Sequence, residues 1–331
     1  YHVNHTVNIT CDENKRSPTI NVILYVFFMA GVLLTVFGNL FVIISISHFK
    51  QLHTPTNFLV LSLATADFLI GLFVMPVSMI RTIEVCWTFG PTVCFCHIFL
   101  DSALSTASVF HLLFIAIDRY YAVCHPLLYT TKITAGVSLV FIAISWLWPM
   151  LYTFIYLHTQ LNIIVNNKNE HCDGLCLSFV DQVWGTLDLL VSFLIPCTVM
   201  LSLYAKVFTV ARHHARALRC LTDHGCSKEQ KKSKGLPSRD KKATKTLGIV
   251  MGVFVFCWLP YSINNIFGFL WLGYLNSGLN PIIYALFYPW FRRSLKQIVT
   301  LKIFIPGSSL INLVTEKTKS HLFSEAKLHL H

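Results

Sequence analysis

Charged residues are scarce in this chain, and that scarcity decides its class. Only 12% of the 331 residues are Asp, Glu, Lys or Arg, whereas 54% are hydrophobic and the mean hydropathy is +0.60. Soluble globular domains carry about 25% charged residues, so an ordinary soluble domain is excluded. The sequence also lacks a phosphate-binding loop, a cluster of metal-ligating residues and a nucleophile–base pair, and it therefore does not favour an enzyme.

Long apolar runs are what the sequence contains instead. A helix needs about 20 mainly apolar residues to cross the roughly 30 Å core of a bilayer. The runs of suitable length are Val22–Ser47, Phe58–Ile80, Cys94–Val123, Ala135–Leu157, Trp184–Val210, Leu247–Asn265 and Phe267–Tyr288. The sequence therefore predicts an all-α membrane protein built as a bundle of seven transmembrane helices across residues 22–288.

Basic residues are unevenly distributed along the chain, whose net charge is +11. They are concentrated in the connection at about 211–245 and at the start of the segment 289–331. Cytoplasmic segments carry an excess of Lys and Arg, so we expect these two in the cytosol and residues 1–21 outside the cell. Clustering beside the membrane favours anionic lipid as the partner of these charges, rather than nucleic acid.

The N-terminal segment is consistent with an extracellular location. Asn4 and Asn8 each begin an Asn-X-Thr tripeptide, which is a glycosylation acceptor. Disulfides form in that oxidising compartment, and the cysteines expected to face it are Cys11, Cys94, Cys172 and Cys176, with Cys86 and Cys96 close to the same surface. Spacing alone leaves their pairing open.

The third apolar run carries a charge near each end. Asp101 and Arg119 are 18 residues apart, which in a helix is five turns and about 27 Å, so both lie on one face near opposite membrane surfaces. An ionised Asp inside a membrane costs roughly 2.5–3.5 kcal/mol, so Asp101 should face the bundle interior and meet a partner. The run therefore predicts a cation-binding site at one end and a charge switch at the other.

Two further polar residues interrupt the first two runs. Asn39 can bridge two helices through hydrogen bonds. Asp67 is costlier to bury, and both an ion or proton site and a purely structural role remain open for it.

One ordered set of motifs resembles the rhodopsin-like G-protein-coupled receptors. It consists of Asn39, Asp67, Asp118-Arg119-Tyr120, Trp146, Pro196, Cys257-Trp258-Leu259-Pro260 and Asn280-Pro281-Ile282-Ile283-Tyr284. More narrowly, the stretches HFKQLHTPTNFL (48–59), KTLGIVMGVF (245–254), WLGYLNS (271–277) and NPIIYALFYPWFRR (280–293) resemble the trace amine-associated receptors. The resemblance implies a plasma-membrane receptor that binds a small amine and couples to a heterotrimeric G protein, of the stimulatory type.

The same resemblance implies a binding site around Asp101. Its carboxylate would pair with a protonated amine in a charge-assisted contact. The other residues of the implied site are Trp258, Tyr261, Asn265, Trp271 and Tyr274, whose aromatic members offer faces to a cation. Core packing is the alternative for these aromatics. An opsin-like retinal site would need a lysine in the seventh run, and none occurs there.

Asp188 in the fifth run resembles the second carboxylate of diamine-detecting members. Two carboxylates sharing a cavity repel each other, and a dication would satisfy both. The alternative is that Asp188 accepts hydrogen bonds from nearby Ser or Thr hydroxyls. A diamine is therefore one expected ligand class.

The resemblance implies an ion site and an output switch as well. Asp67, Ser108, Asn276 and Asn280 resemble the sodium site of the class, an oxygen-only set suited to a hard ion, and no other cofactor is expected. On the cytosolic side Arg119, beside Asp118 and Tyr120, would be held at rest by Asp240. After release, Tyr204 and Tyr284 would offer it their hydroxyls, giving a two-state element biased by ligand.

Family spacing also implies the disulfides Cys94–Cys176 and Cys11–Cys172. The stretch from Phe287 to Ile298 alternates apolar and basic residues and predicts a short amphipathic eighth helix at the interface. No cysteine follows it, so a palmitoyl anchor there is not available.

The chain departs from the family between its sixth and seventh runs. Pro260 and Pro281 are only 21 residues apart, about a dozen fewer than the family places there, so the connection at about 262–270 is shortened. A receptor copy that misfolds or does not signal is one rival interpretation, because of this shortening. An amine transporter is the rival from another class. Transporters usually contain internal repeats, and none is found here.

Overall fold

The computed structural model describes residues 17–84, 87–166, 176, 182–222, 252 and 267–313, and in these residues every regular element is a helix. The α-helices are α1 (Pro18–His48), α2 (Pro55–Leu69), α3 (Met75–Ile83), α4 (Gly90–Cys124), α5 (Pro126–Lys132), α6 (Ala135–Asn166), α7 (Gln182–Asp188), α8 (Ile195–Thr222), α10 (Phe267–Phe287) and α11 (Pro289–Val299). The short helical segments are η1 (Lys50–Leu52), η2 (Ile70–Val74), η3 (Leu189–Leu194), η5 (Lys302–Phe304) and η6 (Ser308–Leu310).

Five helices in the described part are long and apolar enough to cross a membrane. They are Pro18–His48, Pro55–Ile83, Gly90–Cys124, Ala135–Thr159 and Gly185–His213. Each coincides with one of the first five predicted runs, and its ends lie within four residues of the predicted ones. The seventh run is α10, and the sixth, apart from Gly252, lies outside the described residues. Because α10 begins at Phe267, the last four residues of the connection expected at 262–270 are helical.

Two of the long helices contain a π-helical turn just before a proline. The segment η2 joins α2 to α3, whose second residue is Pro76, and η3 joins α7 to α8, whose second residue is Pro196. Proline has no backbone N–H and its ring clashes with the preceding turn, so a wider turn accommodates it without ending the helix. Each pair of helices therefore continues as one span.

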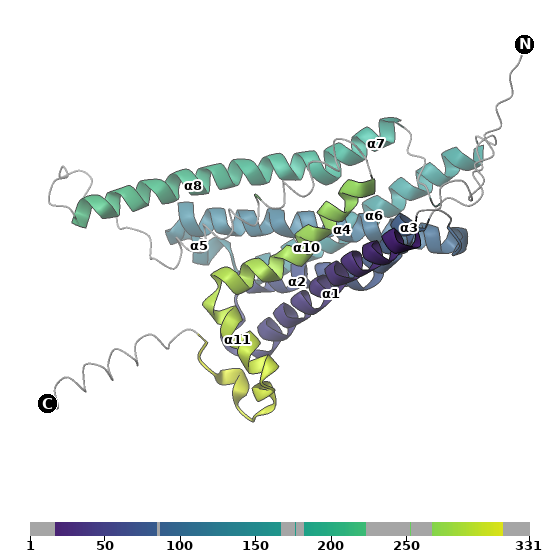
Figure 1. Cartoon of the computed structure of the whole chain (residues 1–331). Coiled ribbons are helices and arrows are strands. Elements are labelled where there is room, and N and C mark those ends of the chain that lie inside the picture. Colours follow the sequence, from purple (N-terminus) through teal and green to yellow (C-terminus); the bar gives the residue numbers. More distant parts are fainter. Residues whose placement is uncertain are drawn as a thin grey trace, which may run out of the picture.

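The helix α4 lies at the centre of the bundle, where it packs against α2, α6 and α8 (Figure 1). A buried apolar cluster joins these helices to α10 and contains Leu59, Leu112, Met200 and Ile283. On the other side α10 packs closely on α1. A Cβ added at Gly38 would lie only 2.9 Å from the Pro281 ring, which shows how near the two backbones are. Small residues allow such close approach between membrane helices.

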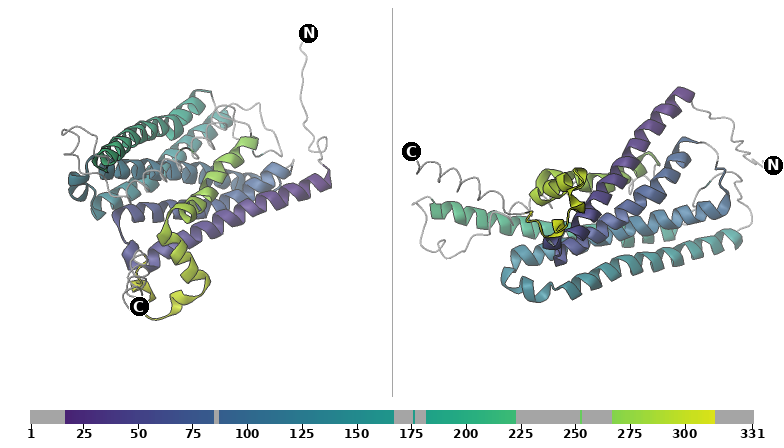
Figure 2. Two further views of the ribbon diagram at one scale, coloured as in Figure 1. Left: turned by 60° about the vertical axis from the view of Figure 1, so that its left-hand side comes forward. Right: turned by 90° about the horizontal axis from the view of Figure 1, so that it is seen from below.

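The chain turns sharply at Tyr288, and α11 lies across the end of α1 (Figures 1 and 2). Phe291 and Ile298 on its inner face are buried, whereas Arg292 and Lys296 are exposed. The predicted amphipathic helix is therefore present, with bounds within two residues of those expected.

Candidate functional site

The Asp101 carboxylate lies where three helices meet. The Tyr274 hydroxyl of α10 is close enough to interact with it, and Ser105, one turn along α4, donates to its Oδ1 at 3.5 Å. Arg81 of α3 is close enough to interact electrostatically with it. Tyr274, one of the residues of the implied site, therefore lies beside Asp101.

A chain of buried hydrogen bonds continues from this carboxylate. The Tyr274 hydroxyl lies 2.8 Å from Ser78 Oγ, which in turn lies 3.2 Å from His97 Nε2. His97 is one helical turn before Asp101 on α4 and is 4% exposed. Sequence reasoning missed His97, although its spacing of four from Asp101 places the two on one face.

Donor and acceptor chemistry gives this chain a direction. An ionised carboxylate only accepts, so Tyr274 donates to Asp101 and its oxygen must receive the Ser78 hydrogen. Ser78 then accepts from Nε2–H of a neutral His97, whose Nδ1 is left as an acceptor. In the described part of the chain that Nδ1 atom is buried without a hydrogen-bond partner.

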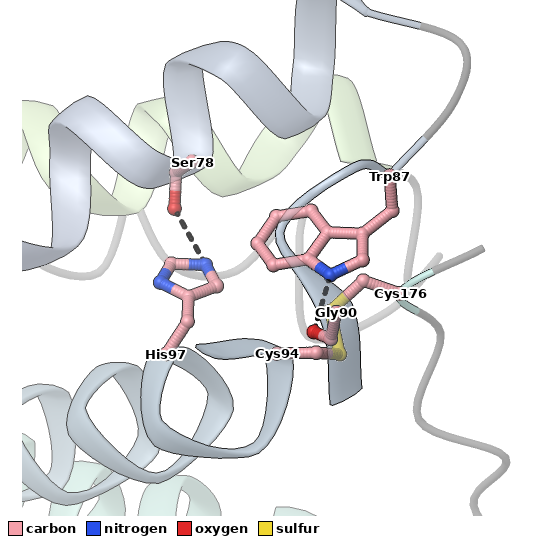
Figure 3. The surroundings of a disulfide bond; sticks show 6 residues. All are labelled: Ser78, Trp87, Gly90, Cys94, His97 and Cys176. Carbon is pink, nitrogen blue, oxygen red and sulfur yellow. Dashed lines mark hydrogen bonds between the residues drawn. A yellow bond between two sulfur atoms is a disulfide. The ribbon is translucent and has the colours of Figure 1, made fainter. Parts of the chain in front are cut away.

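The disulfide Cys94–Cys176 closes this end of the bundle, as expected, with its Cα atoms 5.7 Å apart. Figure 3 shows it beside Trp87, with His97 facing Ser78 across the gap between two helices. The Trp87 indole donates to the carbonyl of Gly90 at 2.8 Å, at the turn that starts α4. The second expected disulfide, Cys11–Cys172, and the acceptors Asn4 and Asn8 lie outside the described residues.

Trp271 contacts its own helix and the neighbouring ones rather than Asp101. Its ring stacks on Phe28 of α1 with centroids 3.9 Å apart, and its indole N–H donates to Thr82 Oγ1 at 3.1 Å. One face of the indole is thus covered, and the core-packing alternative holds for that face. The other expected pocket residues, Trp258, Tyr261 and Asn265, lie outside the described residues.

The hydrogen-bond partners of Asp188 come from other helices than those of Asp101. The Oδ1 atom of Asp188 accepts from Ser192 Oγ at 2.9 Å and from the Tyr152 hydroxyl of α6 at 3.2 Å. The hydrogen bonds of Asp188 therefore run to α6 and η3, whereas those of Asp101 run to α10. The hydroxyl contacts raised as the alternative are present, and Tyr152 was not foreseen.

Asp67 is fully buried and accepts three hydrogen bonds. The donors are Ser277 Oγ at 2.7 Å, Asn280 Nδ2 at 2.8 Å and Ser108 Oγ at 3.1 Å. Ser277 was not in the set that the family pattern suggested, whereas its neighbour Asn276 was, and one residue along a helix turns a side chain by about 100°.

The surroundings of Asp67 fit a hard cation. The buried side-chain oxygens of Asn39, Asn276 and Asn280 have no hydrogen-bond partner in the described residues. Amide and carboxylate oxygens are the ligand type that suits a hard ion. Asn39 also bridges helices as predicted, because its Nδ2 donates to the Ser277 carbonyl at 3.0 Å.

At the far end of α4 from Asp101, Arg119 forms an ion pair with Asp118 and also donates to Thr56 Oγ1 and, at 3.4 Å, to the Tyr129 hydroxyl. Thr56 and Tyr129 donate in turn to the Asp118 carboxylate at 2.9 and 3.0 Å. Burial and the neighbouring Asp118 carboxylate raise the pKa of the Tyr129 phenol, which lies on α5 outside the spans. Sequence spacing gave no signal for these two partners, since they come from separate elements.

Of the other residues expected in the switch, two tyrosines are buried and one lies away from Arg119. Tyr204 and Tyr284 are both buried, and the Tyr204 hydroxyl has no hydrogen-bond partner in the part of the chain described. The Tyr120 hydroxyl instead lies 3.3 Å from Nε2 of His125, at an exposed position away from the Arg119 cluster. Asp240 lies outside the described residues.

Comparison with known proteins agrees with this architecture. The family model described as "7 transmembrane receptor (rhodopsin family)" matches residues 38–284. The chain is 45% identical to trace amine-associated receptor 4 of Rattus norvegicus over 323 residues, covering 92% of this chain and 93% of that protein. It is 44% identical to trace amine-associated receptor 13c of Danio rerio over 326 residues, covering 93% and 95%. With trace amine-associated receptor 1 of Homo sapiens the identity is 43% over 328 residues, covering 94% and 97%.

Proposed function

Because this chain belongs to the rhodopsin family of seven-transmembrane receptors, and is similar to trace amine-associated receptors along nearly its whole length, we propose that it detects a small protonated amine through Asp101. Family membership makes it a multi-pass plasma-membrane receptor that couples to a G protein, and not an enzyme. It also disfavours the two rival readings, an amine transporter and a copy that does not signal.

The observation that carries the proposal is the set of partners around Asp101. The carboxylate contacts the neutral hydroxyls of Tyr274 and Ser105. Arg81 of α3 acts on it electrostatically but forms no ion pair with it, since the one ion pair in the described residues joins Arg119 to Asp118. A carboxylate in this setting attracts a cation. At a separation of about 4 Å an ammonium gains roughly 4 kcal/mol with an effective dielectric constant near 20.

A diamine is the favoured ligand class within this proposal. Both hydroxyls that bind Asp188 donate to Oδ1, so neither occupies Oδ2. That oxygen can accept from a second ammonium while Asp101 holds the first. The similarity to trace amine-associated receptor 13c and its relatives supports an amine, but the choice of a diamine rests on Asp188 alone.

Ligand binding would be transmitted to the Arg119 cluster. Arg119 would exchange Asp118, Thr56 and Tyr129 for the buried Tyr204 hydroxyl and admit a G protein of the stimulatory type. With the Arg119 cluster facing the G protein in the cytosol, residues 1–21 are extracellular.

A sodium ion held by Asp67 and the oxygens around it would stabilise the resting arrangement. Replacing sodium with choline should then raise agonist affinity in the wild type but not in Asp67→Asn.

The test is cAMP production in cells that express the receptor with an N-terminal epitope tag. Staining of unpermeabilised cells verifies surface delivery and the external N-terminus. Asp101→Asn keeps the shape and removes the charge, so potency for every amine should fall at least about 100-fold at equal surface staining. Unchanged potency would overturn the proposal.

Asp188→Asn separates the ligand classes in the same assay. Diamines should lose potency by about tenfold or more, whereas monoamines of similar length keep theirs. If both classes respond alike to this substitution, Asp188 has the structural role that its hydroxyl contacts suggest.

A further inference from the structure

The carboxylate of Asp188 is held through one of its two oxygens. The Tyr152 hydroxyl of α6 and the Ser192 hydroxyl of η3 both donate to Oδ1, at 3.2 and 2.9 Å. A carboxylate oxygen offers about two lone pairs, so these two hydrogen bonds use the capacity of Oδ1 and a further donor must approach Oδ2. The two hydroxyls therefore determine which oxygen of Asp188 a ligand can use.

The charge of Asp188 is less compensated than that of Asp101. Arg81 acts electrostatically on Asp101, whereas the partners of Asp188 in the described residues are neutral hydroxyls. Asp188 is also partly exposed, unlike the fully buried Asp67. Contact with lipid is costly for an ionised carboxylate, so the exposed part of Asp188 should face the bundle interior. A second ammonium can therefore reach Asp188 and is attracted by it.

The ring of Tyr152 is stacked between two other aromatic rings of α6. Trp148 lies four residues before it and Tyr156 four residues after it, on the same face of the helix. Their ring centroids are 6.2 and 6.3 Å from that of Tyr152, and the planes are inclined by 16° in both pairs. These separations are typical of offset stacking. A phenol packed in this way has little freedom to rotate, so its hydroxyl keeps a fixed position.

Tyr152 also fixes Asp188 relative to a second helix. Ser192 lies four residues after Asp188 in the same span, so these two residues move together. The hydrogen bond from Tyr152 instead joins the carboxylate to α6, which packs against α4, the helix that carries Asp101. The Tyr152 hydroxyl therefore sets where Oδ2 of Asp188 lies relative to Asp101.

We propose that Tyr152 is a positioning residue for diamines. By holding Oδ1 of Asp188 it fixes Oδ2, and with it the separation between the two ammonium groups that the site accepts. The inference rests on the proposed function and adds to it the residue that selects the length of the diamine. Tyr152 acts through Asp188 and not by contact with the ligand.

Tyr152→Phe tests this in the cAMP assay, because phenylalanine keeps the stacked ring and removes only the hydroxyl. Straight-chain diamines of increasing length are compared with monoamines of matching length, at equal surface staining. The preferred diamine should lose about tenfold in potency, the effect of one hydrogen bond to a charged group, while monoamines stay within about twofold. The preference for one diamine length should also weaken. An equal loss for monoamines, or an unchanged length preference, would refute positioning.

Ser145→Ala is the matched control. It also removes a buried hydroxyl from α6, but one that donates to the Phe141 carbonyl of the same helix. Both ligand classes should respond to this variant as they do to the wild type. A loss confined to diamines in Ser145→Ala as well would mean that the effect is not particular to Tyr152, and would overturn its role.

An Asp188→Asn background separates action through Asp188 from direct contact with the ligand. In that background Tyr152→Phe should cause no further loss of diamine potency, and a second loss of the same size would overturn the proposal. If Asp188→Asn alone keeps the preference for diamines, the diamine assignment fails and this inference fails with it. If Asp188→Asn removes that preference and Tyr152→Phe does not weaken it, the proposed function stands and Tyr152 alone loses its role.

Discussion

Replacing Ser78 with alanine tests the directed hydrogen-bond chain next to Asp101. Ser78 is 1% exposed and connects the Tyr274 hydroxyl to His97 Nε2. The substitution removes two hydrogen bonds, each with a net contribution of about 1 kcal/mol, and strands the Nε2–H of His97. A buried donor without a partner costs about 1–3 kcal/mol, so the free energy of unfolding should fall by about 2–4 kcal/mol.

A double-mutant cycle with His97 distinguishes the loss of these hydrogen bonds from a general loss of packing. In a His97→Leu background no donor is stranded, and Ser78→Ala should then cost at least ~1 kcal/mol less. Denaturant unfolding in mixed micelles measures all four proteins. Ser138 provides a matched control, because it is equally buried and its hydroxyl has no hydrogen-bond partner in the described residues. Ser138→Ala should therefore be nearly neutral. Equal costs for Ser78→Ala in both backgrounds would refute a stabilising hydrogen bond between Ser78 and His97.

Three further outcomes are expected. Thr56→Val removes a neutral partner of Arg119 and should raise ligand-independent cAMP, and an unchanged basal level would place the restraint elsewhere. Gly38→Ala puts a Cβ within 2.9 Å of Pro281 and should destabilise the α1–α10 contact by about 1–3 kcal/mol, measured as a lower unfolding midpoint. Because the pKa of Tyr129 is raised on folding, its stabilising effect is complete below pH ~10 and is lost as pH rises through the folded pKa. Wild type should therefore lose stability relative to Tyr129→Phe above that pH, and parallel curves would contradict this.

The sequence predicted what depends on a single helix. Hydropathy located the first five spans and α10, and the five-turn separation of Asp101 and Arg119 placed them near opposite ends of α4. Family spacing supplied the Cys94–Cys176 pairing, which spacing by itself left open.

Contacts between helices were harder to predict, because they depend on how far each helix is rotated about its axis. Asp67 binds Ser277 where the family pattern pointed to Asn276, a difference of one position. Thr56 and Tyr129 reach Arg119 from two other elements, and no periodicity within one helix relates them. Tyr152 reaches Asp188 in the same manner.

The π-helical turn η2 divides the second span into two halves of different phase. Asp67 lies before it and Ser78 after it, and each half contributes to a different polar cluster. Five residues in a π-helix turn the chain about a quarter-turn less than in an α-helix. A variant that straightened this turn would swing Ser78 away from Tyr274 while leaving Asp67 with its own partners. The half of the span that follows η2 can therefore change the groups that it presents to a ligand without disturbing the polar centre around Asp67 that the half before η2 maintains.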